Sequence, residues 1–175
     1  MVATALLAAV RQTRRALGTW PDRKSWKAAL ALAAPATAII ALSGYLGGWL
    51  HLATMASLPS ALLAAFILFF VPALAEELAF RGLLLSWFAS LSQRVGNWLS
   101  IALYVLWHPA QALAFGQPWS AIYLQPSFLF ATFILGIVLT HVRIRSQSLW
   151  PVIAIHWLLV VAWTLVLGGP YYWEG

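Results

Sequence analysis

The chain has 175 residues, of which 63% are hydrophobic and 8% are charged, and its mean hydropathy is +0.86. Soluble domains carry about 25% charged residues, so this composition excludes an ordinary cytosolic enzyme, and its high hydrophobicity excludes a disordered chain. We therefore expect an integral membrane protein of the all-α class, a polytopic helical bundle. The net charge of +6 does not indicate a nucleic-acid partner, because the cations cluster beside apolar runs. There is no cysteine, which excludes disulfides and thiolate chemistry.

Residues 1–27 form the first segment and carry six of the ten Lys and Arg residues. The first ten residues are uncharged, whereas a signal peptide places its cations first, so a signal peptide is not expected. The segment instead predicts a short basic helix in the cytoplasmic membrane interface, with membrane lipids as partners of its cations. Residues 28–175 are expected to form the membrane domain.

Five apolar segments follow and are expected to cross the bilayer: residues 28–50, 60–91, 98–114, 121–142 and 149–168. The second would extend about 48 Å as one helix, so we expect it to be tilted and bent near Pro72. Two short half-spans are the alternative interpretation of this segment.

The positive-inside rule supports five crossings. With the N-terminus in the cytoplasm, nine of the ten cations lie on the cytoplasmic side, and Arg81 lies inside the membrane. Two full crossings within 60–91 would instead move Arg94, Arg143 and Arg145 to the other side. We therefore expect a plasma-membrane protein, of a bacterial kind, with its C-terminus opposite the cytoplasm.

Three ionisable residues interrupt the second segment. Glu77 and Arg81 are i, i+4 neighbours on a helix, with the carboxylate first, which is the favoured orientation for an ion pair. Glu76 points about 100° away from Glu77 and needs another partner. Intramembrane carboxylates indicate function by default, although a purely structural ion cluster would also explain Glu77 and Arg81.

Two histidines lie in other predicted spans. Counted from the cytoplasmic ends of their helices, His108 and His156 lie roughly 16 and 10 Å deep, so both are expected to meet Glu76 in the cytoplasmic half of the membrane. A desolvated glutamate can remove a proton from water, one histidine can orient that water, and the other can donate to an oxyanion. Peptide hydrolysis near the cytoplasmic leaflet is therefore the expected reaction, and Trp107 and Trp157 are candidates to line the site.

Other protease chemistries lack their residues. The one aspartate, Asp22, lies outside the spans, no His-Glu-x-x-His sequence is present, and no serine follows a glycine by two positions.

Three motifs in order carry a resemblance to a known family. Residues 76–82 read Glu-Glu-Leu-Ala-Phe-Arg-Gly, and residues 104–108 read Tyr-Val-Leu-Trp-His. They resemble the EExxxR and FxxxH motifs of the CAAX-processing and bacteriocin-processing (CPBP) family of glutamic-type intramembrane proteases, which includes CAAX prenyl protease 2. His156 lies where the third motif, HxxxN or HxxxD, is expected, and the resemblance covers about residues 60–165.

The resemblance implies a role for each site residue. Glu76 and His108 would activate the water, His156 would help to stabilise the oxyanion, and Glu77 and Arg81 would support the site. Tyr104 stands where the family has Phe, and Val160 stands where it has Asn or Asp. A lost oxyanion donor costs about 10²–10³ in rate, so an indole N–H of Trp157 or Trp163 is a possible replacement.

The resemblance implies a peptide or protein substrate, no resident cofactor and no metal, and leaves the oligomeric state open. Two other interpretations remain. One is a non-catalytic membrane binding protein, such as a bacteriocin-immunity factor, that keeps the pocket. The other is a zinc enzyme or proton-conducting site that uses Glu76, His108 and His156.

Overall fold

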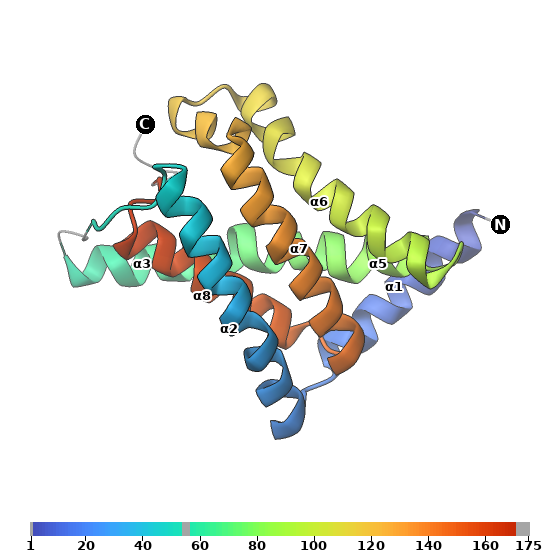
Figure 1. The fold of residues 1–175 in the computed structure, drawn as a ribbon. Helices are drawn as coiled ribbons and strands as arrows, with labels where there is room; N and C mark the ends of the chain where they lie inside the picture. Colours follow the sequence, from blue (N-terminus) through green and yellow to red (C-terminus); the bar gives the residue numbers. More distant parts are fainter. Residues whose placement is uncertain (1, 54–56, 171–175) are drawn as a thin grey trace.

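The computed structural model describes residues 2–53 and 57–170. In these ranges the chain is helical, without strands, which confirms the predicted all-α membrane bundle (Figure 1). The elements in chain order are α1 Val2–Gly18, α2 Arg23–Leu46, α3 Leu58–Leu68, the π-helical η1 Phe69–Leu74, α4 Ala75–Glu77, the π-helical η2 Leu78–Leu84, α5 Leu85–Phe88, α6 Gln93–Phe115, the 3₁₀ helix η3 Pro118–Leu124, α7 Pro126–Ser146 and α8 Trp150–Val166.

Each of the five predicted spans overlaps a helical segment, but the fourth, 121–142, begins within η3, and its long helix α7 begins at Pro126. Among the described residues, α2, the continuous segment Leu58–Phe88 and α7 are long and apolar enough to cross a membrane, and α8 is a shorter apolar helix. The first span was placed too late in the chain. Its helix begins at Arg23 instead of 28, because the Asp22 side chain accepts the Ser25 N–H at 2.7 Å and caps the helix. These hydrogen bonds from Ser25 hold the pKa of the Asp22 carboxyl below its ordinary value.

The segment Leu58–Phe88, which we call the second span, bends where the sequence predicts. Val71, just before Pro72, has the non-helical backbone angles φ −135° and ψ 115°. The helix resumes after this bend, and α4 places the two glutamates in the middle of the bundle, where both are buried.

The termini of the helices gather in two regions of the bundle. At the first, the turn between α7 and α8 meets α1: the Leu149 N–H donates to the Ala16 carbonyl at 3.1 Å, and the Trp150 indole donates to the Leu17 carbonyl at 2.9 Å. We call it the basic end, because nine of the ten cations lie on α1 or near the helix termini there, namely Arg11, Arg14, Arg15, Arg23, Lys24, Lys27, Arg94, Arg143 and Arg145.

The other end joins the chain after α2 to the start of α7 and the end of α8. The Trp49 indole donates to the Ser127 hydroxyl at 3.2 Å, and the Ala53 N–H donates to the Val166 carbonyl at 2.8 Å. We call this the cation-free end, because its described connections, 47–53, 57, 116–125 and 167–170, contain no Lys or Arg.

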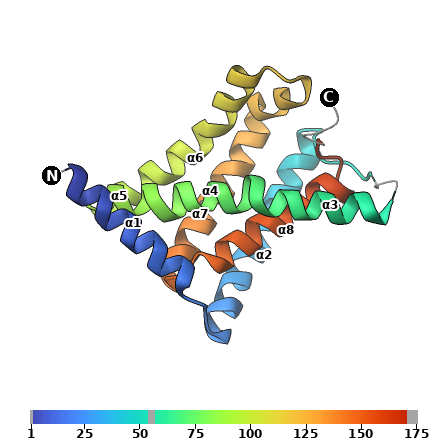
Figure 2. The ribbon, with the colours of Figure 1, turned by 180° about the vertical axis from the view of Figure 1, so that it is seen from behind.

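Helix α1 packs across η2 and α5 on the back of the bundle (Figure 2). Ala9 and Ala16 of α1 are buried, whereas Arg11 and Arg14 are exposed. The approach is close at Gly82, where an added Cβ would lie 2.6 Å from Thr13 Cγ2. The basic helix is therefore part of the packed fold, and its place at a membrane interface stays a prediction.

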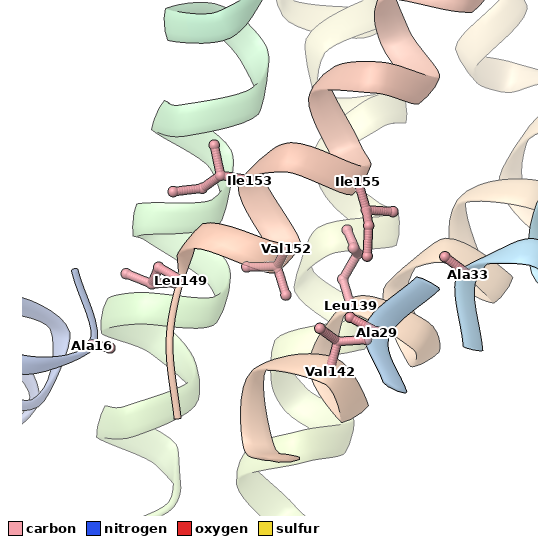
Figure 3. Packing of buried hydrophobic residues seen from close by; sticks show 9 residues of the cluster. All are labelled: Ala16, Ala29, Ala33, Leu139, Val142, Leu149, Val152, Ile153 and Ile155. Carbon is pink, nitrogen blue, oxygen red and sulfur yellow. The ribbon is translucent and has the colours of Figure 1, made fainter. Parts of the chain in front are cut away.

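The core of the basic end is formed by small and branched side chains from four helices. Figure 3 shows Leu149 and Ile153 on one side of α8 and Ile155 on the side of α7 and α2. The buried cluster comprises Ala16, Ala29, Ala33, Leu139, Val142, Leu149, Val152, Ile153 and Ile155.

Candidate active site

The acidic motif forms an ion pair in the middle of the bundle. Glu77 Oε1 accepts from Arg81 Nη1 at 2.9 Å, and both side chains are completely buried. The guanidinium lies over the ring of Tyr104, with Cζ 3.9 Å from the ring centroid, which adds a cation–π contact from α6. The i, i+4 pair predicted from the sequence is therefore present, and Tyr104 of the second motif supports it.

His156 of α8 joins this pair. Its Nδ1 lies 2.8 Å from Glu77 Oε1. A carboxylate paired with Arg81 is ionised and can only accept, so Nδ1 carries the hydrogen and donates it. The other ring nitrogen, Nε2, lies 3.9 Å from Glu76 Oε2. Glu77 thus fixes the ring so that Nε2 lies beside Glu76.

Glu76 is held from one side only. Its Oε1 accepts from the indole N–H of Trp107 at 3.0 Å, while Oε2 is buried without a hydrogen-bond partner among the described residues. Buried polar atoms are normally paired, so an unpaired carboxylate oxygen beside a cavity is a candidate contact for a water or a substrate. From the sequence, Trp107 was predicted only to line the site. Its position next to His108 was the signal that could have suggested the bond.

His108 lies on α6 among aromatic rings. Its Nδ1 is 3.0 Å from the Tyr104 carbonyl, which can only accept, so in the neutral ring Nε2 is the basic nitrogen. The rings of Tyr104, Tyr123 and Phe128 pack around it. Within the described residues no hydrogen bond or ion pair is found between His108 and Glu76, although both line one cavity. His156 is instead the histidine beside Glu76.

Glu76 and Glu77 lie in one short α-helical turn between two π-helical stretches. Single π turns are frequent at functional sites, because they shift the backbone hydrogen bonds. In η2, the Phe80 carbonyl accepts from the Ser100 hydroxyl at 2.7 Å, which ties the second span to α6. No sequence signal predicted this contact.

Val160 lies one turn after His156, is buried, and lines the same cavity. The two tryptophans expected as replacement donors are engaged elsewhere. The Trp157 indole donates to the Ala65 carbonyl at 2.8 Å, and the Trp163 indole donates to the Trp49 carbonyl at 3.4 Å. Neither of the two indoles predicted as replacement donors is therefore free to serve at Val160.

The cavity has a volume of about 960 Å³, within the range of small-molecule and peptide sites. Glu76, His108, His156 and Val160 contribute to its wall, and most of the remaining lining is apolar or aromatic. His108 lies past the midpoint of α6 counted from the basic end, whereas His156 lies before the midpoint of α8, and Glu76 lies past the midpoint of the second span toward the basic end. The depth of the site in the membrane, as counted from the helix ends, stays a prediction.

The four ionisable groups of the cluster, Glu76, Glu77, Arg81 and His156, can balance their charges. Glu77 and Arg81 cancel each other. If Glu76 is ionised, a doubly protonated His156 cancels it; if Glu76 is protonated, a neutral His156 leaves the cluster neutral as well. One proton shared between Glu76 and His156 therefore satisfies the cluster in both forms, as a low-dielectric site requires.

A metal ion needs several converging ligands. Over residues 2–53 and 57–170, no group of three His, Cys, Asp or Glu side chains is placed to hold one.

Together, the apolar helical bundle and the buried glutamate–histidine cluster beside a cavity define a class, the polytopic membrane protein with an intramembrane polar site. The family follows from the comparison of sequences. The family model of the Rce1-like type II CAAX prenyl endopeptidases matches residues 58–162, more than half of the chain, so the protein belongs to this family of membrane proteases. The match contains the first two motifs and the positions of the third, His156 and Val160. No curated protein and no solved structure matches the chain.

Proposed function

We propose that the protein is an intramembrane endopeptidase of the glutamic type, in which Glu76 and His108 activate a water molecule. The observation that carries the proposal is Glu76 Oε2, a buried carboxylate oxygen without a hydrogen-bond partner on the wall of a cavity that two histidines share. Membership of a membrane-protease family supports the same reaction class.

The proposed reaction begins with a water that donates a hydrogen bond to Glu76 Oε2. Trp107 holds the other oxygen, so the carboxylate presents Oε2 to the cavity. The proton passes to Glu76, with the basic Nε2 of His108 orienting the water, and the water oxygen attacks the peptide carbonyl carbon. The proton then goes to the leaving amine as the carbon–nitrogen bond breaks, which yields a carboxylic acid and an amine.

His156 stabilises the negative charge on the carbonyl oxygen in this scheme. Because Glu77 occupies its Nδ1–H, His156 can donate from Nε2 only when it is doubly protonated. That form is the one that balances an ionised Glu76. The base and the oxyanion donor are thus ready for catalysis in the same charge state of the cluster.

The test is a comparison of the peptides in membranes that contain the wild-type protein or Glu76→Gln. We expect the cleavage products of the wild-type membranes to disappear in the variant. The matched control is Asp22→Asn, which also replaces a carboxylate with an amide but keeps a capping side chain far from the cavity. Identical peptides in all three membranes, with all three proteins folded, would refute the proposal.

A second candidate function is a non-catalytic binding protein of the bacteriocin-immunity kind. Val160 favours it, because the wall beside His156 lacks the amide of the family motif, and Trp157 and Trp163 already donate to backbone carbonyls. Under this function, Glu76→Gln leaves both the peptides and the protective effect unchanged. A zinc-dependent variant is distinguished by metal analysis of the purified protein and by loss of activity on chelation.

A further inference from the structure

Arg143, in the last turn of α7, is a buried cation without an anion. It is only 4% exposed. Arg81, the other buried arginine, is paired with Glu77. Over residues 2–53 and 57–170, by contrast, no hydrogen bond or ion pair of the Arg143 side chain is found, and its Nε is buried without a partner. Buried charges in proteins are normally paired, so Arg143 indicates a place where an anion binds.

Thr140, one turn before Arg143, carries a second donor without an acceptor. Side chains three positions apart share one face of a helix, and long helical side chains lean toward the N-terminus, so Arg143 extends toward Thr140. The hydroxyls of Thr13, Thr37 and Thr132 each donate to the carbonyl four residues earlier at 2.9 Å. Thr140 Oγ1 is buried and has no hydrogen-bond partner among the described residues. One face of α7 therefore presents a hydroxyl and a guanidinium that lack an acceptor.

Helix-end carbonyls, the usual acceptors for an arginine in a last turn, are occupied by other donors at this end. The last carbonyls of α1 accept from the turn between α7 and α8, and the Thr19 carbonyl beyond them accepts from the Ser148 hydroxyl at 2.6 Å. In α7 itself, the Ile144 carbonyl accepts from the Gln147 side-chain amide at 2.6 Å. The dipole of α7 favours a cation in its last turn, but it supplies no acceptor for Arg143 Nε.

The surroundings of Arg143 attract anions. The basic end holds nine of the ten cations, and its one described carboxylate, Asp22, already caps α2 at Ser25. Arg94 at the start of α6 and Arg145 at the end of α7 are exposed there. Basic sites between membrane helices on the cytoplasmic side are typical binding sites for the phosphate of lipid head groups. A phosphate is also the anion that a guanidinium matches best, through parallel N–H bonds.

We propose that Arg143 and Thr140 form a binding site for a phosphate group at the basic end, with the guanidinium and the hydroxyl as donors. A lipid head group and inorganic phosphate share this chemistry, and the experiments below distinguish the two sources. Neither residue lines the cavity of the candidate active site. The phosphate site is therefore separate from that cavity, and it does not depend on the proposed proteolysis.

The first experiment measures thermal unfolding of the delipidated protein in an uncharged maltoside detergent. The probes are a short-chain phosphatidylglycerol, a diacylglycerol with the same chains but no phosphate, and inorganic phosphate alone. We expect phosphatidylglycerol to raise the Tm with increasing concentration, and the diacylglycerol to leave it unchanged. An equal rise with inorganic phosphate supports the site and assigns it to free phosphate. No rise with either phosphate compound, or an equal rise with the diacylglycerol, would overturn the proposal.

The second experiment repeats the titration with variants of the site. Arg143→Met should weaken the apparent affinity for the active phosphate compound at least about tenfold, because it removes a charge-assisted donor. Thr140→Val keeps the shape of the side chain and should weaken the affinity by about severalfold. The matched control is Arg145→Met, which removes an exposed arginine from the same helix and should bind like the wild type. Equal affinities in all four proteins would show that the phosphate binds elsewhere.

The same variants without any phosphate compound test whether Arg143 already has a partner in the chain. We expect the Tm of Arg143→Met to equal or exceed that of the wild type, because methionine fills similar space without an unpaired buried charge. A clearly lower Tm would mean that the guanidinium stabilises the protein by itself, which contradicts the proposal. If Arg143→Met does not accumulate, Thr140→Val decides, since an undiminished affinity in that variant excludes the site.

Discussion

The two ends of the bundle are built from different side chains. At the basic end, alanines and branched aliphatic residues from α1, α2, α7 and α8 pack directly against one another. At the cation-free end, the ring of Phe128 contacts Trp49 edge-to-face and Tyr123 at a tilt, and all three rings line a cavity. Small residues let helices approach closely in a membrane, whereas large rings hold them apart. The ionisable cluster lies between these regions, so one side of it is anchored and the other can bind.

The largest expected effect on folding comes from Glu77→Gln, which removes the carboxylate on the anchored side of the ionisable cluster. It leaves Arg81 buried without an anion and weakens the bond to His156, at a cost of about 3–5 kcal/mol in the free energy of unfolding. The matched change Glu76→Gln, one residue earlier, should leave folded yield near wild type, because Oε2 has no protein partner to lose. Folded yield and thermal unfolding in detergent measure both. Equal losses would mean that the two carboxylates have the same structural role.

Two identical substitutions compare the packing of the two ends. Ile153→Ala, at a residue only 1% exposed in the basic-end cluster, should lower the free energy of unfolding by about 2–5 kcal/mol. Ile40→Ala, on the cavity wall, should cost clearly less, because it enlarges a space that already exists. Unfolding of each variant in the same detergent gives the difference. A greater loss for Ile40→Ala would show that the hollow end is the stabilising one.

Trp107→Phe tests whether the hydrogen bond from the Trp107 indole positions the Glu76 carboxylate on the cavity side of the cluster. Loss of a hydrogen bond to a charged group corresponds to roughly a 10–100-fold lower kcat. KM should change little if the bond positions the carboxylate, whereas a packing defect would affect KM and folded yield. Trp157→Phe is the control, because its N–H donates to the Ala65 carbonyl away from Glu76. A similar fall in kcat for both variants would argue against a specific role for Trp107.

The smallest expected effect, and the only gain, is that of Val160→Asn. An amide one turn after His156 can add an oxyanion donor, and we expect kcat to rise by about severalfold to tenfold, below the full scale of one donor because a buried amide is costly. KM should stay nearly constant, since the gain belongs to the transition state. If kcat is unchanged while His156→Ala abolishes it, this face of α8 does not bind the oxyanion.

Local spacing predicted the parts of the site that depend on one helix. The Glu77–Arg81 pair follows from an i, i+4 relation, and the bend near Pro72 follows from the missing N–H of proline. The motifs also indicated that His108 and His156 meet the glutamates. The choice of His156 as the direct neighbour of Glu76 was not predictable, because it depends on how α8 crosses the second span.

The side of the cavity and the donors around it depend on contacts between distant segments. Counting residues from helix ends gives a depth only for upright helices, so it does not tell on which side of the site the cavity opens. The indole N–H groups of Trp157 and Trp163 reach backbone carbonyls of the second span and of the chain after α2. A sequence pattern does not show which backbone carbonyl will accept a hydrogen bond from a given indole, because that depends on tertiary packing.

The compensated charges of the buried cluster bear on the electrical behaviour of the protein. A transmembrane voltage does work of about 2.3 kcal/mol per 100 mV on each elementary charge that crosses the whole bilayer. In the proposed reaction the proton passes from the water to Glu76 and then to the leaving amine within one site, where Glu76 Oε2 and His156 Nε2 are 3.9 Å apart. It therefore covers a small part of that thickness and leaves the enclosed charge unchanged. The hydrolytic step should accordingly proceed at nearly the same rate in energised and in depolarised membranes, so that the site neither consumes nor senses the membrane potential.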